Sequence, residues 1–337
     1  MARADDGWAA LPAPATVLQR IAFGSCNDQR LAQGFWDAIA ASNPQLLLMM
    51  GDNVYGDVTS AEMTELREAY AHLDAQPRFR RLRARVPIIA IWDDHDYGAN
   101  DAGGDFPYRQ QSAALFRSFW QVPDTSPRGQ RDGLYDAFTF GPSGQQVQII
   151  VLDLRSFRSN LKPTDERGAA GKERYLPDPD PAKTMLGEAQ WSWLGERLRE
   201  PADLRLLVSS IQVLPEGHGW ERWGNLPLER ERLLELIKAS GSGGVVILSG
   251  DRHLGALYQR TRQVAYPLTE ITASSFNRPF RAAREQDPLL LGSLFTEANF
   301  GTIDIDWPKR RLTLELRNDQ GAPVRSQTLE LSRLITG

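Results

Sequence analysis

Short apolar runs recur along this chain and predict a series of buried β-strands. The runs lie at residues 20–25, 45–50, 86–92, 145–154, 204–210 and 245–250. Continuous apolar runs of this length are typical of strands that are covered on both faces. We therefore expect these segments to form the inner strands of a layered α/β fold.

Amphipathic segments between these runs predict helices, at residues 34–42, about 60–73, 187–200 and about 227–240. Ser60 is a residue type that caps helix N-termini, and we expect it to cap the second helix. Beyond residue 254 the pattern changes to short alternating strands. These lie at residues 256–260, 268–274, 301–306, 311–317 and 324–331.

The order of elements favours two sheets packed face to face with helices outside, over a single doubly wound sheet. No linker divides the chain, so we expect one domain over residues 18–337 after a flexible segment, residues 1–17. Residues 155–185 are rich in Arg, Pro, Gly and Asp and are expected to form a long functional loop or lid.

The composition excludes some classes of partner. Apolar residues make up 41% of the chain, charged residues 24%, and the formal net charge is −4, which gives no signature of nucleic-acid binding. No apolar run approaches the roughly 18 residues that a membrane-spanning helix needs. Cys26 is the one cysteine, so the chain has no intramolecular disulfide.

The N-terminal residues carry information about the cellular compartment of the protein. Ala2, Arg3 and Ala4 are similar to the small-x-small tail of a cleaved signal peptide, which favours a secreted or periplasmic protein whose export sequence was removed. A cytoplasmic protein with an Ala- and Pro-rich tail fits the same residues equally well. The sequence leaves the oligomeric state open.

Polar residues follow four of the apolar runs, at the point where each predicted strand ends. They occupy residues 26–28, 51–55, 93–97 and 251–253. In α/β folds ligands bind beyond the carboxyl ends of the strands, so we expect these segments to converge on one crevice. Their side chains exceed the roughly four to eight ligands that one metal ion takes, which favours a two-metal site.

Each segment has a structural alternative when it is taken alone. Cys26 could be a small core residue, and Asp93 with Asp94 could cap a helix. However, Asp93, Asp94 and Asp96 repel one another unless a cation neutralises them, and this segment contains no Lys or Arg. Metal ions would supply the missing positive charge.

Five sequence strings carry a resemblance to a known family. They are FGSCN, GDNVYGD, WDDHDYGANDAG, LGEAQWSWL and LSGDRH. With them the chain resembles the alkaline phosphatase D (PhoD-like) branch of the calcineurin-like metallophosphoesterases, from about residue 20 to beyond residue 280. The resemblance implies a four-layer α/β/β/α sandwich of two mixed sheets flanked by helices.

The resemblance also implies a binuclear metal centre. One metal takes the Cys26 thiolate, the Tyr55 phenolate and His253, while the Asp52 carboxylate bridges both metals. A thiolate and a phenolate on one ion suit a trivalent metal such as Fe³⁺.

The second metal of the implied pair takes Asp94 and Asp251. Gln212 stands where many relatives have a metal-binding histidine, and we expect it to be a weak or water-mediated ligand. Carboxylate and amide oxygens suit a hard cation such as Ca²⁺, so Fe³⁺ with Ca²⁺ is the preferred pair. Zn²⁺ or Mn²⁺ is the alternative.

Two further residues receive catalytic roles. His95 matches the family's histidine that contacts the phosphate and protonates the leaving group. Arg155 follows another predicted strand and could form a bidentate contact to phosphate. The alternative for Arg155 is an ion pair with Asp153 or with a loop carboxylate.

These expectations describe an alkaline phosphatase-like phosphomonoesterase that hydrolyses phosphate esters with water activated by two metals. The first alternative is a phosphodiesterase or phospholipase C-like enzyme, with Trp220, Trp223 and Phe280 around a second ester group. The second alternative is a non-catalytic metal-binding protein. His95 argues against it, because this scheme does not use that histidine as a ligand.

Overall fold

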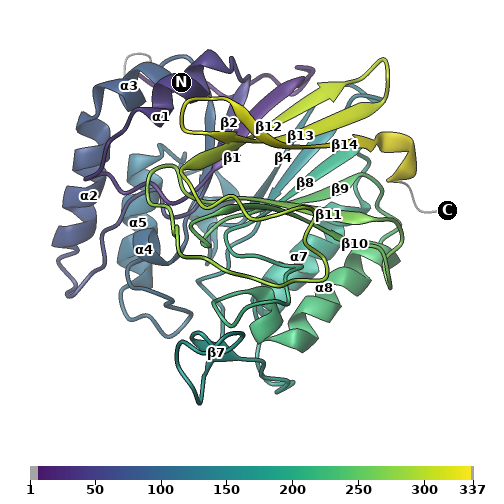
Figure 1. Ribbon diagram of the computed structural model, residues 1–337. Coiled ribbons are helices and arrows are strands. Elements are labelled where there is room, and N and C mark those ends of the chain that lie inside the picture. The colour runs from purple at the N-terminus through teal and green to yellow at the C-terminus, as the bar shows by residue number, and fades with distance from the viewer. Residues whose placement is uncertain (1–6, 335–337) are drawn as a thin grey trace.

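The computed structural model describes residues 7–334, and in this part of the chain two six-stranded mixed sheets form the centre of the molecule (Figure 1). Helices lie outside both sheets, which gives the layers α/β/β/α (Figure 1). The expected fold class is therefore confirmed. No helix among residues 7–334 combines the length and apolar character of a membrane span.

The first sheet joins the two ends of the described chain. Its parallel half is β1 (Arg20–Gly24), β2 (Leu46–Met50) and β3 (Ile88–Ile91). Its antiparallel half is β12 (Asn299–Asp306), β13 (Arg311–Asn318) and β14 (Pro323–Glu330). β1 pairs antiparallel with β12, which gives the order β14-β13-β12-β1-β2-β3.

The second sheet has a parallel centre with antiparallel edges. The central strands are β5 (Val147–Val151), β8 (Leu204–Ser209), β9 (Val245–Ser249) and β11 (Leu268–Ala273). The edges are β4 (Asp136–Phe140) and β10 (Gly255–Arg260), so the order is β10-β11-β9-β8-β5-β4. The predicted inner strands are buried along their length, as continuous apolar runs require.

Helices cover the outer faces of the two sheets (Figure 1). On the first sheet lie α1 (Phe35–Ala41), α2 (Thr64–Ala75), α3 (Pro77–Arg83) and α5 (Arg109–Phe119). On the second sheet lie α7 (Gly187–Arg199) and α8 (Pro227–Ala239). The short helices are α4 (Asp94–Tyr97), α6 (Pro127–Gln130), η1 (Trp223–Asn225) and η2 (Leu331–Arg333).

Some local expectations were wrong. Ser60 does not cap α2, because that helix begins at Thr64 after Met63 in a left-handed conformation, φ 58°. Residues 155–185 are not entirely loop, since β6 (Lys162–Pro163) and β7 (Tyr175–Leu176) form a short antiparallel pair there. The pattern missed α5 because only Ser112 and Phe116 of that helix are buried.

One residue of the N-terminal segment, Trp8, contacts aromatic side chains of the fold. Residues 1–6, including the segment that is similar to a signal-peptide tail, lie outside the described residues. Trp8 lies edge-on to Phe79, Phe119 and Trp120, with ring centroids 5.8, 5.9 and 5.7 Å away. The Arg83 guanidinium lies 4.4 Å from the centre of the same indole. Trp8, within the segment expected to be flexible, therefore packs against aromatic side chains of the fold.

The two sheets pack closely where β10 faces β13. A Cβ atom added to Gly255 would lie 2.2 Å from Cδ2 of Leu316, so only glycine fits there without movement. We predict that Gly255→Ala lowers the free energy of unfolding by about 1–3 kcal/mol through overpacking. Urea unfolding measures this effect. The control is Gly34→Ala, where no atom lies within 4 Å of an added Cβ and φ is −68°. A fully stable Gly255→Ala protein would contradict this account of the sheet interface.

Candidate metal centre and pocket

The backbone turns sharply where the strands meet the predicted site. Cys26, Asp52, Asp251 and His253 all adopt left-handed conformations, with φ of 59°, 49°, 66° and 56°. Non-glycine residues adopt this region rarely, and such strain gathers at functional sites. The expected convergence of the strand-end segments is therefore accompanied by strained backbone at four of the predicted metal ligands.

Two further residues bring the loops after β2 and β3 together. Gly51 has φ of 103°, and a Cβ there would lie 2.5 Å from the Cβ of Asp93, so the loops touch only because Gly51 lacks a side chain. The buried Asp96 carboxylate accepts hydrogen bonds from the backbone N–H groups of Asp52, Asn53 and Asp93. Asp96 thus ties the loops together and does not face the metal ligands.

The predicted ligands of the first metal lie together. Oδ2 of Asp52 accepts a hydrogen bond from the Tyr55 hydroxyl at 3.1 Å and lies 3.4 Å from Sγ of Cys26. The Tyr55 hydroxyl lies 3.0 Å from Nε2 of His253. Cys26, Asp52 and His253 offer sulfur, oxygen and nitrogen atoms that could hold one metal ion.

Burial opposes charge on these ligands. It raises the pKa of the Cys26 thiol to about 12, with a further contribution from the nearby Asp251. Burial also raises the pKa of the Tyr55 hydroxyl well above its usual value, and it lowers the pKa of His253 to about 4. Thiolate and phenolate would thus form here only beside a strong positive charge, which a bound metal ion supplies.

The second group consists of carboxylates. Four residues each offer one carboxylate oxygen, and these four oxygens lie within 4.8 Å of one another. The residues are Asp52, Asp93, Asp94 and Asp251. Burial, followed by the like charges of neighbouring carboxylates, raises the pKa values of Asp52 and Asp251 well above their usual range. Such a group is stable in its charged form only with cations present, so these residues fit a metal site.

Arg155 is placed differently from expectation. Its guanidinium is fully buried and lies 2.6 Å from Asp93 and 2.8 Å from Glu221. The expected phosphate contact is therefore wrong for this structure, because both carboxylates already occupy the fork of the side chain. The alternative of an ion pair with a loop carboxylate is the observed one. Arg155 provides part of the positive charge that the segment around Asp93 lacks in sequence.

Gln212 also faces away from the predicted ligands. Its amide oxygen lies 2.9 Å from Nε2 of His218, and its amide nitrogen donates to Thr272 at 2.8 Å. Both polar ends are thus engaged in a buried network, and Gln212 is not presented as a metal ligand. Trp223 was expected to face a substrate, but its side chain is buried and donates to Ser209.

His95 lies at the edge of the metal ligands. Its Nδ1 atom is 2.7 Å from Oδ1 of Asp57. Burial lowers the pKa of His95, but the carboxylates of Asp94 and Asp57 outweigh burial and raise it above the usual value. The shift makes the protonated form of His95 more favourable than in a free histidine, which suits a proton donor.

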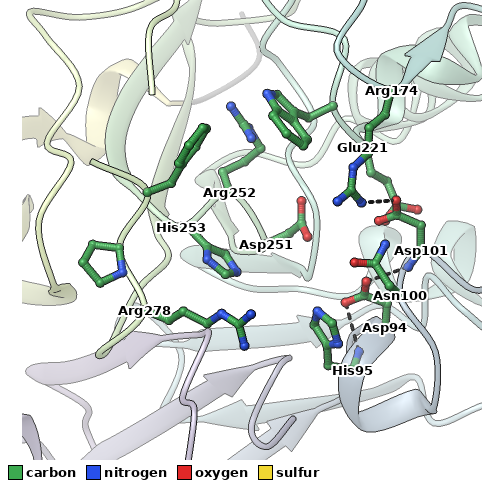
Figure 2. A pocket seen from close by; sticks show the side chains of 13 residues that line it. Asp94, His95, Asn100, Asp101, Arg174, Glu221, Asp251, Arg252, His253 and Arg278 are labelled. Carbon is green, nitrogen blue, oxygen red and sulfur yellow. Dashed lines mark hydrogen bonds and ion pairs between the residues drawn. The ribbon is translucent and has the colours of Figure 1, made fainter. Parts of the chain in front are cut away.

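A cavity of about 330 Å³ opens above these residues (Figure 2). Asp94, Asp251, His253 and His95 line it together with residues that the sequence did not identify. These newly found lining residues include Asn100, Asp101, Arg174, Arg252 and Arg278. Trp220 and Phe280, which the sequence analysis named for a second ester group, line the cavity as well.

Figure 2 shows Arg278 beside His253 and His95 at one side of the cavity. Arg252 could have been found, because it stands between two predicted ligands in LSGDRH. Arg278 follows no motif, and only the fold brings it to the site.

The sequence pattern that defines PhoD-like phosphatases matches residues 21–288. Alkaline phosphatase D of Bacillus subtilis (strain 168) is 26% identical over 284 residues, which cover 72% of this chain and 47% of the relative. The chain therefore spans about half the length of this curated relative.

Solved structures share the fold. The structure of PhoD superposes with a TM-score of 0.73 at 18% identity and covers 94% of this chain and 70% of its own. A purple acid phosphatase from yellow lupin (Lupinus luteus) superposes with a TM-score of 0.61 at 11% identity. The match covers 95% of this chain and 55% of the phosphatase. GAP50, the anchor in the inner membrane complex of Plasmodium, superposes with a TM-score of 0.62 at 12% identity. The match covers 94% of this chain and 89% of GAP50. Because the family pattern matches most of the sequence, this chain belongs to the PhoD-like phosphatase family.

Proposed function

We propose that this protein is a metal-dependent phosphoester hydrolase with phosphomonoesters as its main substrates. The observation that carries the proposal is the meeting of two ligand groups under one cavity. Cys26, Tyr55 and His253 form one group and Asp94 with Asp251 the other, and Asp52 belongs to both. Family membership supports a phosphate ester as the substrate class.

The ligand types support Fe³⁺ at the Cys26 and Tyr55 group and Ca²⁺ at the carboxylate group. Zn²⁺ or Mn²⁺ remains the alternative pair. Ions bound there supply positive charge that stabilises the phosphoryl oxygens and acidifies the attacking water.

The protein's own groups would then act on the leaving group. His95 lines the cavity and is oriented through Nδ1 by Asp57, so its Nε2 atom is available for a proton donation to the departing oxygen. The backbone N–H of His95 donates to Asp52 and Asp94, which fixes the main chain whatever side chain is present. Substitution of the histidine ring should therefore leave the metal ligands in position.

Arg278 is the better candidate for the phosphate contact that Arg155 cannot make. Its side chain is 41% exposed, lines the cavity, and stacks 4.2 Å from the centre of the Tyr55 ring. It pairs with Asp28 through one nitrogen, Nη1, at 3.2 Å, which leaves other N–H donors for a phosphoryl oxygen.

A phosphodiesterase is the second candidate function, and one observation favours it. Trp220 and Phe280 meet edge-on with ring centroids 5.8 Å apart in the cavity wall, which offers an apolar surface to a second ester group. Comparison of p-nitrophenyl phosphate with bis-p-nitrophenyl phosphate decides between the two. A higher kcat/KM on the diester would replace the monoesterase proposal.

The proton-donor role of His95 predicts a dependence on the leaving group. His95→Ala should keep its metals and lose about 10²–10⁴-fold in turnover of alkyl phosphates. The loss should be smaller for p-nitrophenyl phosphate, because its leaving group departs as a stable anion. Steady-state kinetics with metal analysis tests both points. An equal loss on both substrates would instead assign His95 to binding, and lost metals would make it a ligand.

The two arginines should behave differently. Arg278→Gln should lower kcat/KM about 10–100-fold, the value of a charge-assisted contact, with little change in stability because Asp28 keeps its ion pair with Arg30. Arg155→Met should instead lower the free energy of unfolding by about 3–5 kcal/mol, because it leaves the buried Asp93 without its cation and leaves Glu221 with Arg158 alone. Urea unfolding and kinetics on both variants check this. A stable Arg155→Met protein with a raised KM would restore Arg155 as the phosphate contact.

The iron proposal predicts colour. Phenolate and thiolate ligands on Fe³⁺ should give the native protein a visible absorption band. Tyr55→Phe should shift or bleach this band, whereas Tyr97→Phe should not, because Tyr97 donates its hydroxyl to Gly103 at 3.0 Å, away from the ligands. Visible spectroscopy with elemental analysis measures the outcome. A colourless, fully active protein with stoichiometric zinc would refute iron and leave the hydrolase proposal intact.

A further inference from the structure

A second cavity, of about 660 Å³, lies between α5 and the segment that follows α6. Arg109 and Arg117 line it from α5, eight residues apart on one helix face, and Arg131 lines it from the facing segment. Among the described residues, none lines both this cavity and the catalytic pocket. The second cavity is therefore a separate place on the molecule.

The three arginines of this cavity are not engaged in ion pairs. Within residues 7–334, none of them forms an ion pair, and Asp132 is the one carboxylate among the lining residues. Arg109 donates to the carbonyl of Gly104, and Arg131 donates to the carbonyl of Tyr135. The side chain of Arg117 has no partner in the same part of the chain.

The catalytic pocket differs in this respect. Its arginines all have carboxylate partners: Arg174 pairs with Asp101, Arg252 with Glu285 and Arg278 with Asp28. An anion entering the second cavity would therefore meet guanidinium groups that form no ion pairs in the described chain.

The guanidinium of Arg131 is positioned by two aromatic rings. Its guanidinium lies 3.8 Å from the centre of the Tyr135 ring and 5.4 Å from that of Trp193. Its Nε atom is buried and makes no hydrogen bond within the described residues. Partial burial lowers the pKa of Arg131, with an added repulsion from Arg197, while Tyr135 and Asp136 oppose the shift. A buried donor without an acceptor is unfavourable, so the hydrogen-bonding capacity of this guanidinium is not fully used by the described chain.

We propose that this cavity binds a phosphate-type oxyanion, either free or as the terminal group of a small organic phosphate. Guanidinium groups bind phosphate oxygens through paired N–H donors, and the side-chain amides of Gln110 and Gln130 line the same cavity as further donors. The volume leaves room beyond one phosphate ion. The proposal does not depend on hydrolysis at the catalytic pocket.

Isothermal titration of the metal-loaded protein with inorganic phosphate tests the site, and phenylphosphonate, which has no ester bond to hydrolyse, serves as the organic probe. Arg109→Gln/Arg117→Gln should weaken the binding of at least one probe about tenfold or more, the value of lost charged contacts. Arg131 is left intact because its stacking also supports the fold. The double variant should hydrolyse p-nitrophenyl phosphate within about twofold of the native rate.

The matched control is Arg85→Gln/Arg262→Gln, which removes the same charge at two exposed side chains without ion pairs among residues 7–334. It should bind both probes like the native protein. Arg278→Gln, altered in the catalytic pocket, should keep the binding that the double variant loses. Equal affinity for the two probes indicates the free ion as ligand, and tighter phenylphosphonate binding indicates an organic phosphate.

Native-like binding of both probes by Arg109→Gln/Arg117→Gln would overturn the proposal. A similar loss in the control would also overturn it, because the effect would then come from net charge. If circular dichroism shows that the double variant is unfolded, Arg117→Gln alone replaces it. That side chain makes no hydrogen bond or ion pair in the described chain, so its loss should not affect folding. The single variant should weaken probe binding by a smaller factor, and no change would count against the site.

Discussion

Repulsion between buried carboxylates dominates the centre of this protein. Asp52, Asp93, Asp94 and Asp251 lie at the ends of strands in both sheets, close enough that all four cannot carry full charge without cations. One cation is built into the fold, because Arg155 lies against Asp93. Within residues 7–334 neither Asp52 nor Asp251 forms an ion pair with an arginine or a lysine, and this imbalance is the physical reason for expecting metal ions.

The two packed sheets hold these like charges together, and the backbone at the strand ends adopts unfavourable conformations. The predicted metal ligands lie where strands end, and four of them occupy left-handed backbone conformations. Asp96 and Gly51 lock the loops after β2 and β3 against each other. The stability of two packed sheets therefore supports a strained set of ligands, as is common where a site must be arranged before its ligand binds.

The fold alone does not determine the chemistry. The same architecture occurs in GAP50, an anchor of a membrane complex, as well as in a purple acid phosphatase. In this chain the proposed chemistry rests on the donor set at the strand ends and on the distribution of arginines. Arginines with carboxylate partners line the catalytic pocket, whereas three without such partners line the cavity beside α5.

The sequence by itself determined the strands, the layered class and the candidate ligands in motifs, because apolar runs and strand-end polar residues are local signals. It identified Cys26, Asp52 and His253 for this reason. Only the tertiary structure decided the partners of Arg155 and Gln212, and it alone brought Arg278 to the pocket. Those roles depend on which groups, distant in sequence, meet in space. Side-chain pairing across loops leaves no periodic trace in a single chain, so the sequence could name candidate groups but not the contacts that they make.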